Sequence, residues 1–416
     1  MGTAVGISAG AIGVTGAMTK RAVHTVFGSI ERNLRNERRR KKSDARPLID
    51  EVFGESLHKK RLDSLTNGTE GVLRAARLSI HAIGQAYAEF AQIKPKSGIN
   101  QVDRFLNNRA IDVEALQAPW GMFVLGGRNE LVIALDWTEF DDDDHTTLAA
   151  YVVTTHGRAT PLAWKTYRKS ELKGNQKGHE FAMVEHLHRI IPEDVRITLV
   201  ADRGFGDKQF YAFLELHHWD YVIRFRGNIM VEHKGEAKPA SDWLPPSGRA
   251  TKLVGAKVTS EGAEVPAVVV VKRPKMKDAW HLATSLSAAS ATRIIRLYGR
   301  RFTIEETFRD QKDIRFGMGL RATHINDAGR RDRILLLAAI AHALLTLLGA
   351  AAEEAGLDRY LKANTVKHRT HSLFRQGSYW YGCIPTMRED WLIPLLEAFE
   401  RIVTGHAVFE EVFAVI

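Results

Sequence analysis

The sequence predicts a mixed α/β protein in which helical regions flank a core of alternating strands and helices. Short β-rich runs alternate with helical segments between residues 130 and 225, and helical spacing of apolar residues is found before and after them. At 416 residues and 44% hydrophobic content, the chain is long enough for two or three domains with substantial cores. Its single cysteine, Cys383, excludes a disulfide framework and indicates a reducing, intracellular compartment.

The amino-terminal part of the chain is strongly basic. Residues 1–62 hold 13 Lys and Arg but only 6 Asp and Glu, and most of the formal net charge of +10 lies there. Such a balance favours a polyanionic partner, nucleic acid first. Eight of the sixteen residues at 31–46 are Lys or Arg, a run that is usually a solvated arm. Its central residues are our candidate DNA contacts: Arg38, Arg39, Arg40, Lys41 and Lys42.

The elements follow in a defined order. Helical spacing predicts helices at 69–90, 100–106 and 112–125. The next segments are predicted as strands at 130–137, 147–155 and 158–164, a helix at 176–190, a strand at 196–201, a helix at 208–217 capped by Asp207, and a strand at 221–225. This order resembles the ribonuclease-H-like arrangement more than a doubly wound nucleotide fold. No GxxxxGK[ST] loop is present, which argues against ATP chemistry.

After residue 228 the alternation of predicted strands and helices is interrupted, and helical spacing returns further along the chain. Residues 228–281 are rich in Gly, Pro and Lys with short β-rich pieces, and we expect a small β insertion there. We therefore divide the chain into six segments: 1–17, a disordered leader with Met18 as an alternative start; 18–125, a basic helical DNA-binding domain; 126–227, the first part of the core; 228–283, the β insertion; 284–352, the second part of the core; and 353–416, a helical carboxyl-terminal region.

One segment late in the chain has the length and apolar composition of a membrane-spanning helix. Residues 334–352 contain only His342 and Thr346 as polar side chains and are long enough to cross a bilayer. The alanines of this segment, the three arginines just before it and its isolation favour a buried core helix instead.

Two aspartates follow apolar strands and are candidates for chemistry. Asp136 ends the predicted strand at 130–137, and Asp202 directly follows the one at 196–201. A carboxylate at the end of a strand reaches solvent and can bind a metal ion, although each alone is more often a loop-starting or helix-capping residue. The four consecutive aspartates at 141–144 are interpreted as a solvated turn.

A helix predicted over residues 298–312 offers the third carboxylate. At about 100° per residue, Tyr298, Arg301, Glu305 and Lys312 lie within about 60° of one another on one face, and Glu306 lies about 100° from Glu305. A solvated Arg–Glu pair at i,i+4 is the alternative interpretation, which we would favour without the two aspartates.

These residues resemble a known signature. The pattern Tyr-x2-Arg-x3-Glu-x6-Lys is typical of bacterial insertion-sequence transposases of the DDE class with the YREK signature (the type-four insertion-sequence family), and Tyr298, Arg301, Glu305 and Lys312 match it without a gap. The stretches ALDWT around Asp136 and VADRGF around Asp202 resemble the two other acidic motifs of that family. The likeness covers roughly residues 99–350.

The resemblance implies a catalytic site. Asp136, Asp202 and Glu305 would form the triad on a ribonuclease-H-like core and hold Mg²⁺ (or Mn²⁺), two ions per site, because oxygen ligands suit these metals. Tyr298, Arg301 and Lys312 would contact phosphates near the cleaved end. Trp280 resembles a tryptophan that stacks on an everted base, with an ordinary core residue as an equal alternative.

By the same resemblance, the protein would bind terminal inverted repeats as a homodimer and perform cut-and-paste transposition in the bacterial cytoplasm, at the nucleoid and without a membrane. Its double-stranded DNA partners would be the transposon ends and the target. Two alternatives remain open: a DNA-binding regulator, which would be expected to lose a carboxylate, and a ribonuclease-H-like nuclease without strand transfer, which would not need the phosphate-gripping tetrad.

Overall fold

The structure, a computed structural model, describes residues 45–259 and 262–404. The predicted leader and the basic run at residues 38–42 lie outside this described part. The chain divides into two compact units, which we describe separately. The first contains the described parts of Met1–Asp112, Met122–Gly127 and Arg333–Val412, and the second contains Val113–Gly121 and the described part of Arg128–Asp332. The six segment boundaries drawn from the sequence remain predictions.

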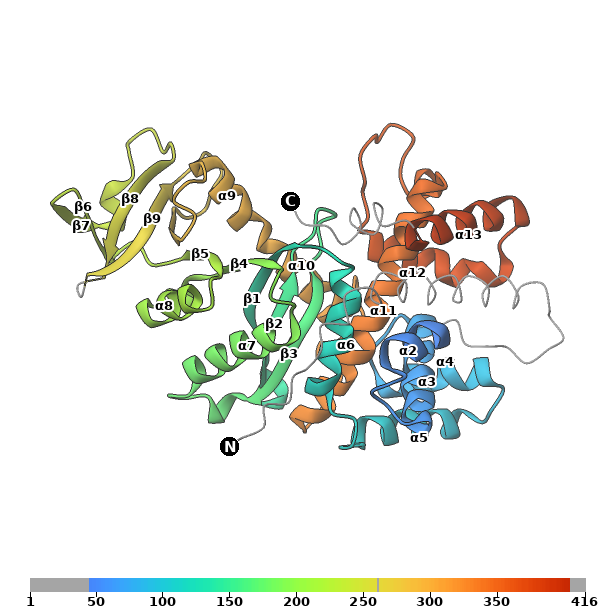
Figure 1. Cartoon of the computed structure of the whole chain (residues 1–416). Helices are drawn as coiled ribbons and strands as arrows, with labels where there is room; N and C mark the ends of the chain where they lie inside the picture. Colours follow the sequence, from blue (N-terminus) through green and yellow to red (C-terminus); the bar gives the residue numbers. More distant parts are fainter. Residues whose placement is uncertain (1–44, 260–261, 405–416) are drawn as a thin grey trace, which may run out of the picture. The chain divides into compact units, whose positions relative to one another are not determined.

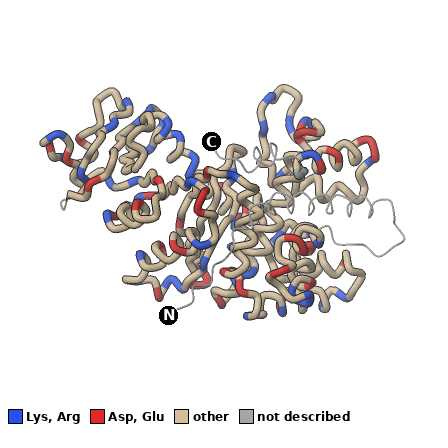
Figure 2. The backbone as a smooth tube through the Cα atoms, viewed as in Figure 1, with Lys and Arg blue, Asp and Glu red and all other residues tan. Residues whose placement is uncertain are grey.

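The first unit is helical and combines segments from early and late in the chain (Figure 1). Its helices are α2 (Arg46–Phe53), α3 (Lys59–Ala75), α4 (Ile80–Ala91), α5 (Pro95–Asn107), most of α11 (Ala328–Glu354), α12 (Leu373–Cys383) and α13 (Glu389–Thr404), together with the end of α6 (Val113–Leu125). In Figure 2, basic and acidic residues are interspersed along the described backbone.

The single helix predicted at residues 69–90 is wrong. Helix α3 ends at Ala75, and Ala76 takes a left-handed conformation with φ 47°. Ser79 then begins α4 by accepting a hydrogen bond from the Ala82 N–H. Apolar spacing could not reveal this break, because Leu78 in the connection is as deeply buried as Ile83 in the helix.

Helix α11 is the core helix of the first unit. Within the described chain it alone is long and apolar enough to cross a membrane, and 94% of its most apolar window is buried inside the protein. Small residues let α12 approach it closely, since a Cβ at Gly377 would lie only 1.7 Å from the carbonyl oxygen of Leu345. This burial favours the core-helix interpretation of residues 334–352.

The second unit is built on a sheet of ten strands, and it confirms the predicted mixed α/β, ribonuclease-H-like class. The strands lie in the order β3-β2-β1-β4-β5-β10-β9-β8-β6-β7. Strand β1 pairs antiparallel with β2 and parallel with β4, and β4 pairs parallel with β5. The strands are β1 (Glu130–Phe140), β2 (His145–Val152), β3 (Thr160–Arg168), β4 (Arg196–Ala201), β5 (Asp220–Arg224), β6 (Met230–His233), β7 (Glu236–Pro239), β8 (Thr251–Val258), β9 (Ala263–Val271) and β10 (Trp280–Thr284).

The β insertion is present but continues the core sheet. Strand β10 returns beside β5 with Leu282 opposite Arg224, and β9 and β8 follow on its other side. The side chains from Val268 to Val271 are fully buried, which explains the continuous apolar run of this segment. The insertion therefore extends the edge of the core instead of forming a separate sheet.

Helices cover both faces of the core sheet (Figure 1). Successive side chains of a strand point to opposite faces. Trp137 of β1 donates from its indole N–H to Glu180 of α7 (Gln176–Ile190), and the preceding Asp136 contacts the segment that joins α9 (Ala291–Arg300) and α10 (Phe302–Lys312). Helix α8 (Lys208–Leu216) packs beside β5 and is capped by Asp207, as predicted.

Candidate active site

Asp136 and Asp202 lie side by side at one edge of the parallel part of the sheet. The register of β1 and β4 ends with Leu135 opposite Ala201, so the next residue of each strand is one of the two aspartates. Asp136 does not end its strand, which is a correction to the sequence analysis. Strand β1 continues to Phe140, because β2 still pairs with it there. The two carboxylates meet because the parallel pairing stops, and not because both strands stop.

Arg301 brings the third carboxylate to this edge. Its Nη1 donates to Asp136 Oδ2 at 2.9 Å, and its Nη2 donates to Glu305 Oε1 at 2.6 Å. The side chain of Arg301 is 4% exposed, whereas that of Glu305 is 50% exposed. A planar guanidinium suits this bridging position because its donors are fixed in a fork. The structure thus places one arginine between two of the three predicted triad residues.

Tyr298 completes the group from the other side. Its hydroxyl donates to Asp202 Oδ1 at 3.2 Å, and burial raises the pKa of Tyr298 to about 12. The predicted single helix over residues 298–312 is wrong in one respect, because Arg301 separates α9 from α10. Its backbone dihedrals stay helical, at φ −49° and ψ −37°, so Tyr298 and Glu305 still face the same edge of the sheet.

The group around Arg301 carries more negative than positive charge. Burial raises the pKa of the Asp136 carboxyl to about 6, with Arg301 opposing the rise and the charges of Glu305 and Asp202 adding to it. Burial works against the charge of Arg301 too, yet the surrounding acidic groups hold its pKa above the ordinary arginine value. The two pKa shifts have different leading causes, burial for Asp136 and nearby acidic groups for Arg301, but in both the charges of the gathered acidic groups raise the pKa.

Lys312, the last residue of α10, contacts β1 at Thr138, two residues beyond Asp136 and on the same face of the strand. Its ammonium group donates to Thr138 Oγ1 at 3.1 Å and to the Glu139 carbonyl at 2.6 Å. Burial lowers its pKa to about 8. The four residues of the sequence signature therefore lie in one strip along this face of the sheet. Tyr298, Arg301 and Glu305 lie beside Asp136 and Asp202, and Lys312 lies at the far end of the strip.

Trp280 belongs to an aromatic cluster beside this strip. Its ring lies 4.8 Å from that of Tyr298 and 5.9 Å from that of Phe302, measured between centroids. Phe302 is 37% exposed, and its ring centroid lies 4.8 Å from the guanidinium carbon of Arg301. The sequence analysis missed this residue, although it follows Arg301 directly. The cluster offers an aromatic surface next to the carboxylates.

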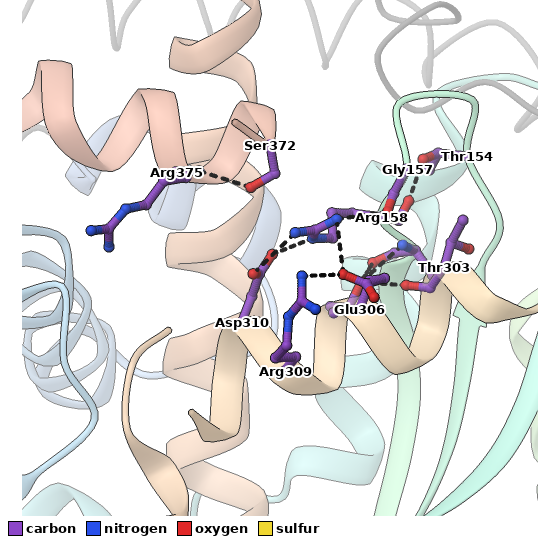
Figure 3. Close-up of polar contacts among 11 residues, drawn as sticks. Thr154, Gly157, Arg158, Thr303, Glu306, Arg309, Asp310, Ser372 and Arg375 are labelled. Atoms are coloured by element: carbon purple, nitrogen blue, oxygen red, sulfur yellow. Dashed lines mark hydrogen bonds and ion pairs between the residues drawn. The ribbon is translucent and has the colours of Figure 1, made fainter. Parts of the chain in front are cut away.

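Glu306 belongs to a different group of contacts on α10 (Figure 3). It pairs with Arg309 and lies 3.6 Å from Arg158, which follows the turn between β2 and β3. Arg158 also donates two hydrogen bonds to Asp310, and both of those side chains are largely buried. This group, which we call the Arg158 clamp, fixes α10 to the turn on a side of the helix away from Glu305.

The acidic run at 141–144 is more than the solvated turn expected from the sequence. The side chain of Asp143 is only 6% exposed and pairs with the fully buried Arg331. Asp141 pairs with Lys169, and Asp144 accepts hydrogen bonds from Ser170. The run anchors neighbouring elements of the second unit and contributes no carboxylate to the group around Arg301.

A cavity of about 580 Å³ lies on the opposite face of β1 from Asp136. Trp137, Gln176 and three lysines contribute to its lining. Two of the lysines are already paired, Lys169 with Glu139 and Asp141, and Lys177 with Asp207. The sequence analysis did not find this cavity, because its residues come from separate elements.

The donor chemistry of the site fits a divalent metal ion. Among residues 45–259 and 262–404, no group of three or more His, Cys, Asp or Glu side chains is arranged to hold a metal. The guanidinium of Arg301 instead holds Asp136 and Glu305 together. Burial raises the pKa of Asp136 most, and the charges of Glu305 and Asp202 raise it further, so a cation held by these carboxylates would relieve their repulsion. Asp136, Asp202 and Glu305 provide only oxygen ligands, which suit Mg²⁺ or Mn²⁺.

A ribonuclease-H-like sheet with acidic side chains gathered at one edge is typical of enzymes that cut or join nucleic acids. Residues 168–344 match the family model described as "Transposase DDE domain". This stretch, which includes Asp202 and Glu305, is similar to that domain, and the match confirms the DDE-class resemblance seen in the sequence. No curated protein matches the chain.

Proposed function

We propose that the protein is a cut-and-paste DNA transposase whose triad is Asp136, Asp202 and Glu305. One observation carries the proposal: Arg301 joins Asp136 to Glu305 beside Asp202, although these residues come from three separate elements. The match of residues 168–344 to a transposase DDE domain supports the assignment of Asp202 and Glu305, while Asp136 lies outside the matched residues.

The three carboxylates would hold two Mg²⁺ ions. When bound, such ions activate the attacking oxygen and stabilise the leaving oxygen of a phosphodiester. The side chains that surround the carboxylates would position the DNA. Arg301 would give up one carboxylate and turn its fork toward a phosphate, and Tyr298 and Lys312 would donate to neighbouring phosphate oxygens.

The proposed chemistry is a series of substitutions at phosphorus with two main steps; cutting the second strand of the end, which excision also requires, is a substitution of the same type. In the first, a water oxygen attacks the phosphodiester at a transposon end, a new P–O bond forms, and the bond to O3′ breaks to leave a free 3′-hydroxyl. In the second, that hydroxyl attacks a phosphodiester of the target and releases a 3′-hydroxyl there. Each attacking oxygen loses one proton and each departing oxygen gains one, so no oxidant is needed.

Paired ends require two active sites, and we propose a homodimer on the terminal inverted repeats. The basic run at residues 38–42 would add affinity through phosphate contacts. Such a protein would act at the bacterial nucleoid. The YREK subgroup assignment is part of the same proposal.

The test compares cleavage of a labelled transposon end by matched variants. Asp136→Asn and Asp202→Asn should bind the end normally but lose Mg²⁺- and Mn²⁺-dependent cleavage. Asp141→Asn is the control, because Asp141 lies in an acidic run but pairs only at the surface with Lys169. Normal cleavage by the first two variants would refute the triad, and so would loss of cleavage in the control alone.

A further inference from the structure

The turn that follows α10 exposes two large apolar side chains. Ile314 is 55% exposed and Phe316 is 64% exposed, whereas the next apolar residues, Met318 and Leu320, are buried. Burial of an aromatic ring is among the strongest driving forces of folding. An apolar pair displayed in this way therefore indicates a surface that contacts something other than water.

Local hydrogen bonds to the Asp313 side chain and to the backbone hold the turn in place. Asp313 Oδ1 accepts hydrogen bonds from the N–H groups of Arg315 and Phe316, both at 2.7 Å. The Met318 N–H donates to the Asp310 carbonyl at 2.7 Å. Gly317 is required at this close approach, since a Cβ there would lie 2.2 Å from the Asp310 oxygen. Phe316 is thus presented on an ordered support.

The surroundings of the turn are basic. Arg309, Arg315 and Arg321 are all exposed. Acidic groups near these arginines are already engaged: Asp313 caps the turn, Glu306 pairs with Arg309, and Asp141, which also interacts electrostatically with Arg321, pairs with Lys169. An apolar tip flanked by arginines matches the chemistry of a nucleic-acid duplex, whose phosphates attract the cations and whose base steps accept an apolar wedge.

The turn and the Trp280 cluster mark opposite ends of the helix that carries Glu305. Helix α10 runs for eleven residues from Phe302 to Lys312, a length of about 16 Å. Strand transfer brings two duplexes to the carboxylates, the transposon end and the target. If the terminal base of the end lies at the aromatic cluster and its phosphates reach Lys312, the target duplex meets the turn just beyond Lys312.

We propose that residues 313–316 form a target-DNA wedge, in which Phe316 inserts between base pairs of the target and Arg309, Arg315 and Arg321 hold the flanking phosphates. Insertion of an apolar side chain from the minor groove unstacks one base step and kinks the duplex. The kink presents a target phosphate to the carboxylates. This inference rests on the proposed transposase function and assigns the substrate contacted by this surface.

The experiment uses the full chain in Mg²⁺, with pre-cleaved transposon ends and a linear target duplex to measure strand transfer, and an uncleaved end to measure end binding and end cleavage. We compare Phe316→Ser, Phe316→Leu and the control Leu216→Ser, which removes an apolar side chain that is 73% exposed at the end of α8. Phe316→Ser should reduce strand transfer about tenfold, with end binding and end cleavage changed less than about twofold. Phe316→Leu and Leu216→Ser should retain strand transfer. A target with a central mismatch kinks easily, so it should restore strand transfer by Phe316→Ser.

Four results would overturn the wedge: unchanged transfer by Phe316→Ser, an equal loss of end cleavage, no rescue by the mismatched target, or conversion of a dimer to a monomer by Phe316→Ser without DNA. The last would make the turn a protein contact. Failure of the proposed function has a different signature, because normal end cleavage by Asp136→Asn would refute the triad whatever Phe316→Ser does.

Discussion

Removal of Arg158 should destabilise the second unit strongly, because it leaves a buried carboxylate without its main cation. Arg158 is 13% exposed and Asp310 is 5% exposed, and two hydrogen bonds join them (Figure 3). Breaking a buried pair by removing one partner costs about 3–5 kcal/mol. With a urea dependence of about 2 kcal/mol per M, Arg158→Met should lower the urea concentration at the midpoint of unfolding by roughly 1.5–2.5 M.

The assay is urea unfolding of the full chain, followed by tryptophan fluorescence. Trp120, Trp137, Trp164, Trp219, Trp243 and Trp280 all lie in the second unit, so the signal reports mainly on it. The matched control is Arg196→Met, which breaks a pair with Glu130 in which the arginine is 77% exposed. Surface pairs contribute about 0–1 kcal/mol, and the control should shift the midpoint little.

A double variant separates the charge from the packing. Arg158→Met combined with Asp310→Leu should be more stable than Arg158→Met alone, because no buried charge is left behind. Equal midpoint shifts for Arg158→Met and Arg196→Met would refute the reasoning about burial. A double variant as unstable as the sum of its parts would refute the pairing.

Three further predictions concern DNA. If Trp280 stacks on an everted base, the contact should contribute about 1–3 kcal/mol. Trp280→Ala should then impair end processing more than end binding, and an abasic end should restore activity. Loss of the melting transition in this variant would instead indicate a core role. Because Lys312 has a pKa of about 8 and binds phosphate only when protonated, wild-type end affinity should fall as the pH rises through 8, whereas Lys312→Arg should show no such fall in a titration of affinity against pH. Replacement of all five basic residues at 38–42 by Gln should reduce the slope of log affinity against log salt by about 4, and an unchanged slope would exclude that run as a DNA contact.

The sequence was most informative where chemistry and periodicity coincide. Asp136 and Asp202 were found because each follows an apolar strand, and Glu305 because it shares a helix face with Tyr298 and Arg301. The bridging position of Arg301 could not be predicted, since it depends on the parallel register that ends at Leu135 and Ala201. Contacts between elements distant in the chain leave no periodic signal.

The errors also have physical causes. The break at Ala76 was missed because apolar residues continue through the connection between α3 and α4. The extent of β1 was underestimated because Thr138 and Glu139 are polar, yet pairing with β2 keeps them in the strand. The buried role of Asp143 depends on Arg331, almost two hundred residues away. No local pattern encodes such a pair.

The contacts of Glu305 and Glu306 make these neighbours an internal comparison. Glu305 contacts Arg301 beside Asp136, whereas Glu306 contacts Arg158 and Arg309 on another side of α10. The two substitutions Glu305→Gln and Glu306→Gln remove the same charge and preserve the size of the side chain. Any difference between the variants therefore reports on position and not on chemistry.

The most direct measurement is cleavage of a labelled transposon end in Mg²⁺ by Glu305→Gln and Glu306→Gln, side by side and at equal end binding. Only Glu305 should bind metal with Asp136 and Asp202, because metal binding requires its negative charge. We predict that Glu305→Gln binds the end and does not cleave it, and that Glu306→Gln retains most of its activity. An active Glu305→Gln with an inactive Glu306→Gln would contradict the placement of α10, and normal cleavage by both would contradict the triad itself.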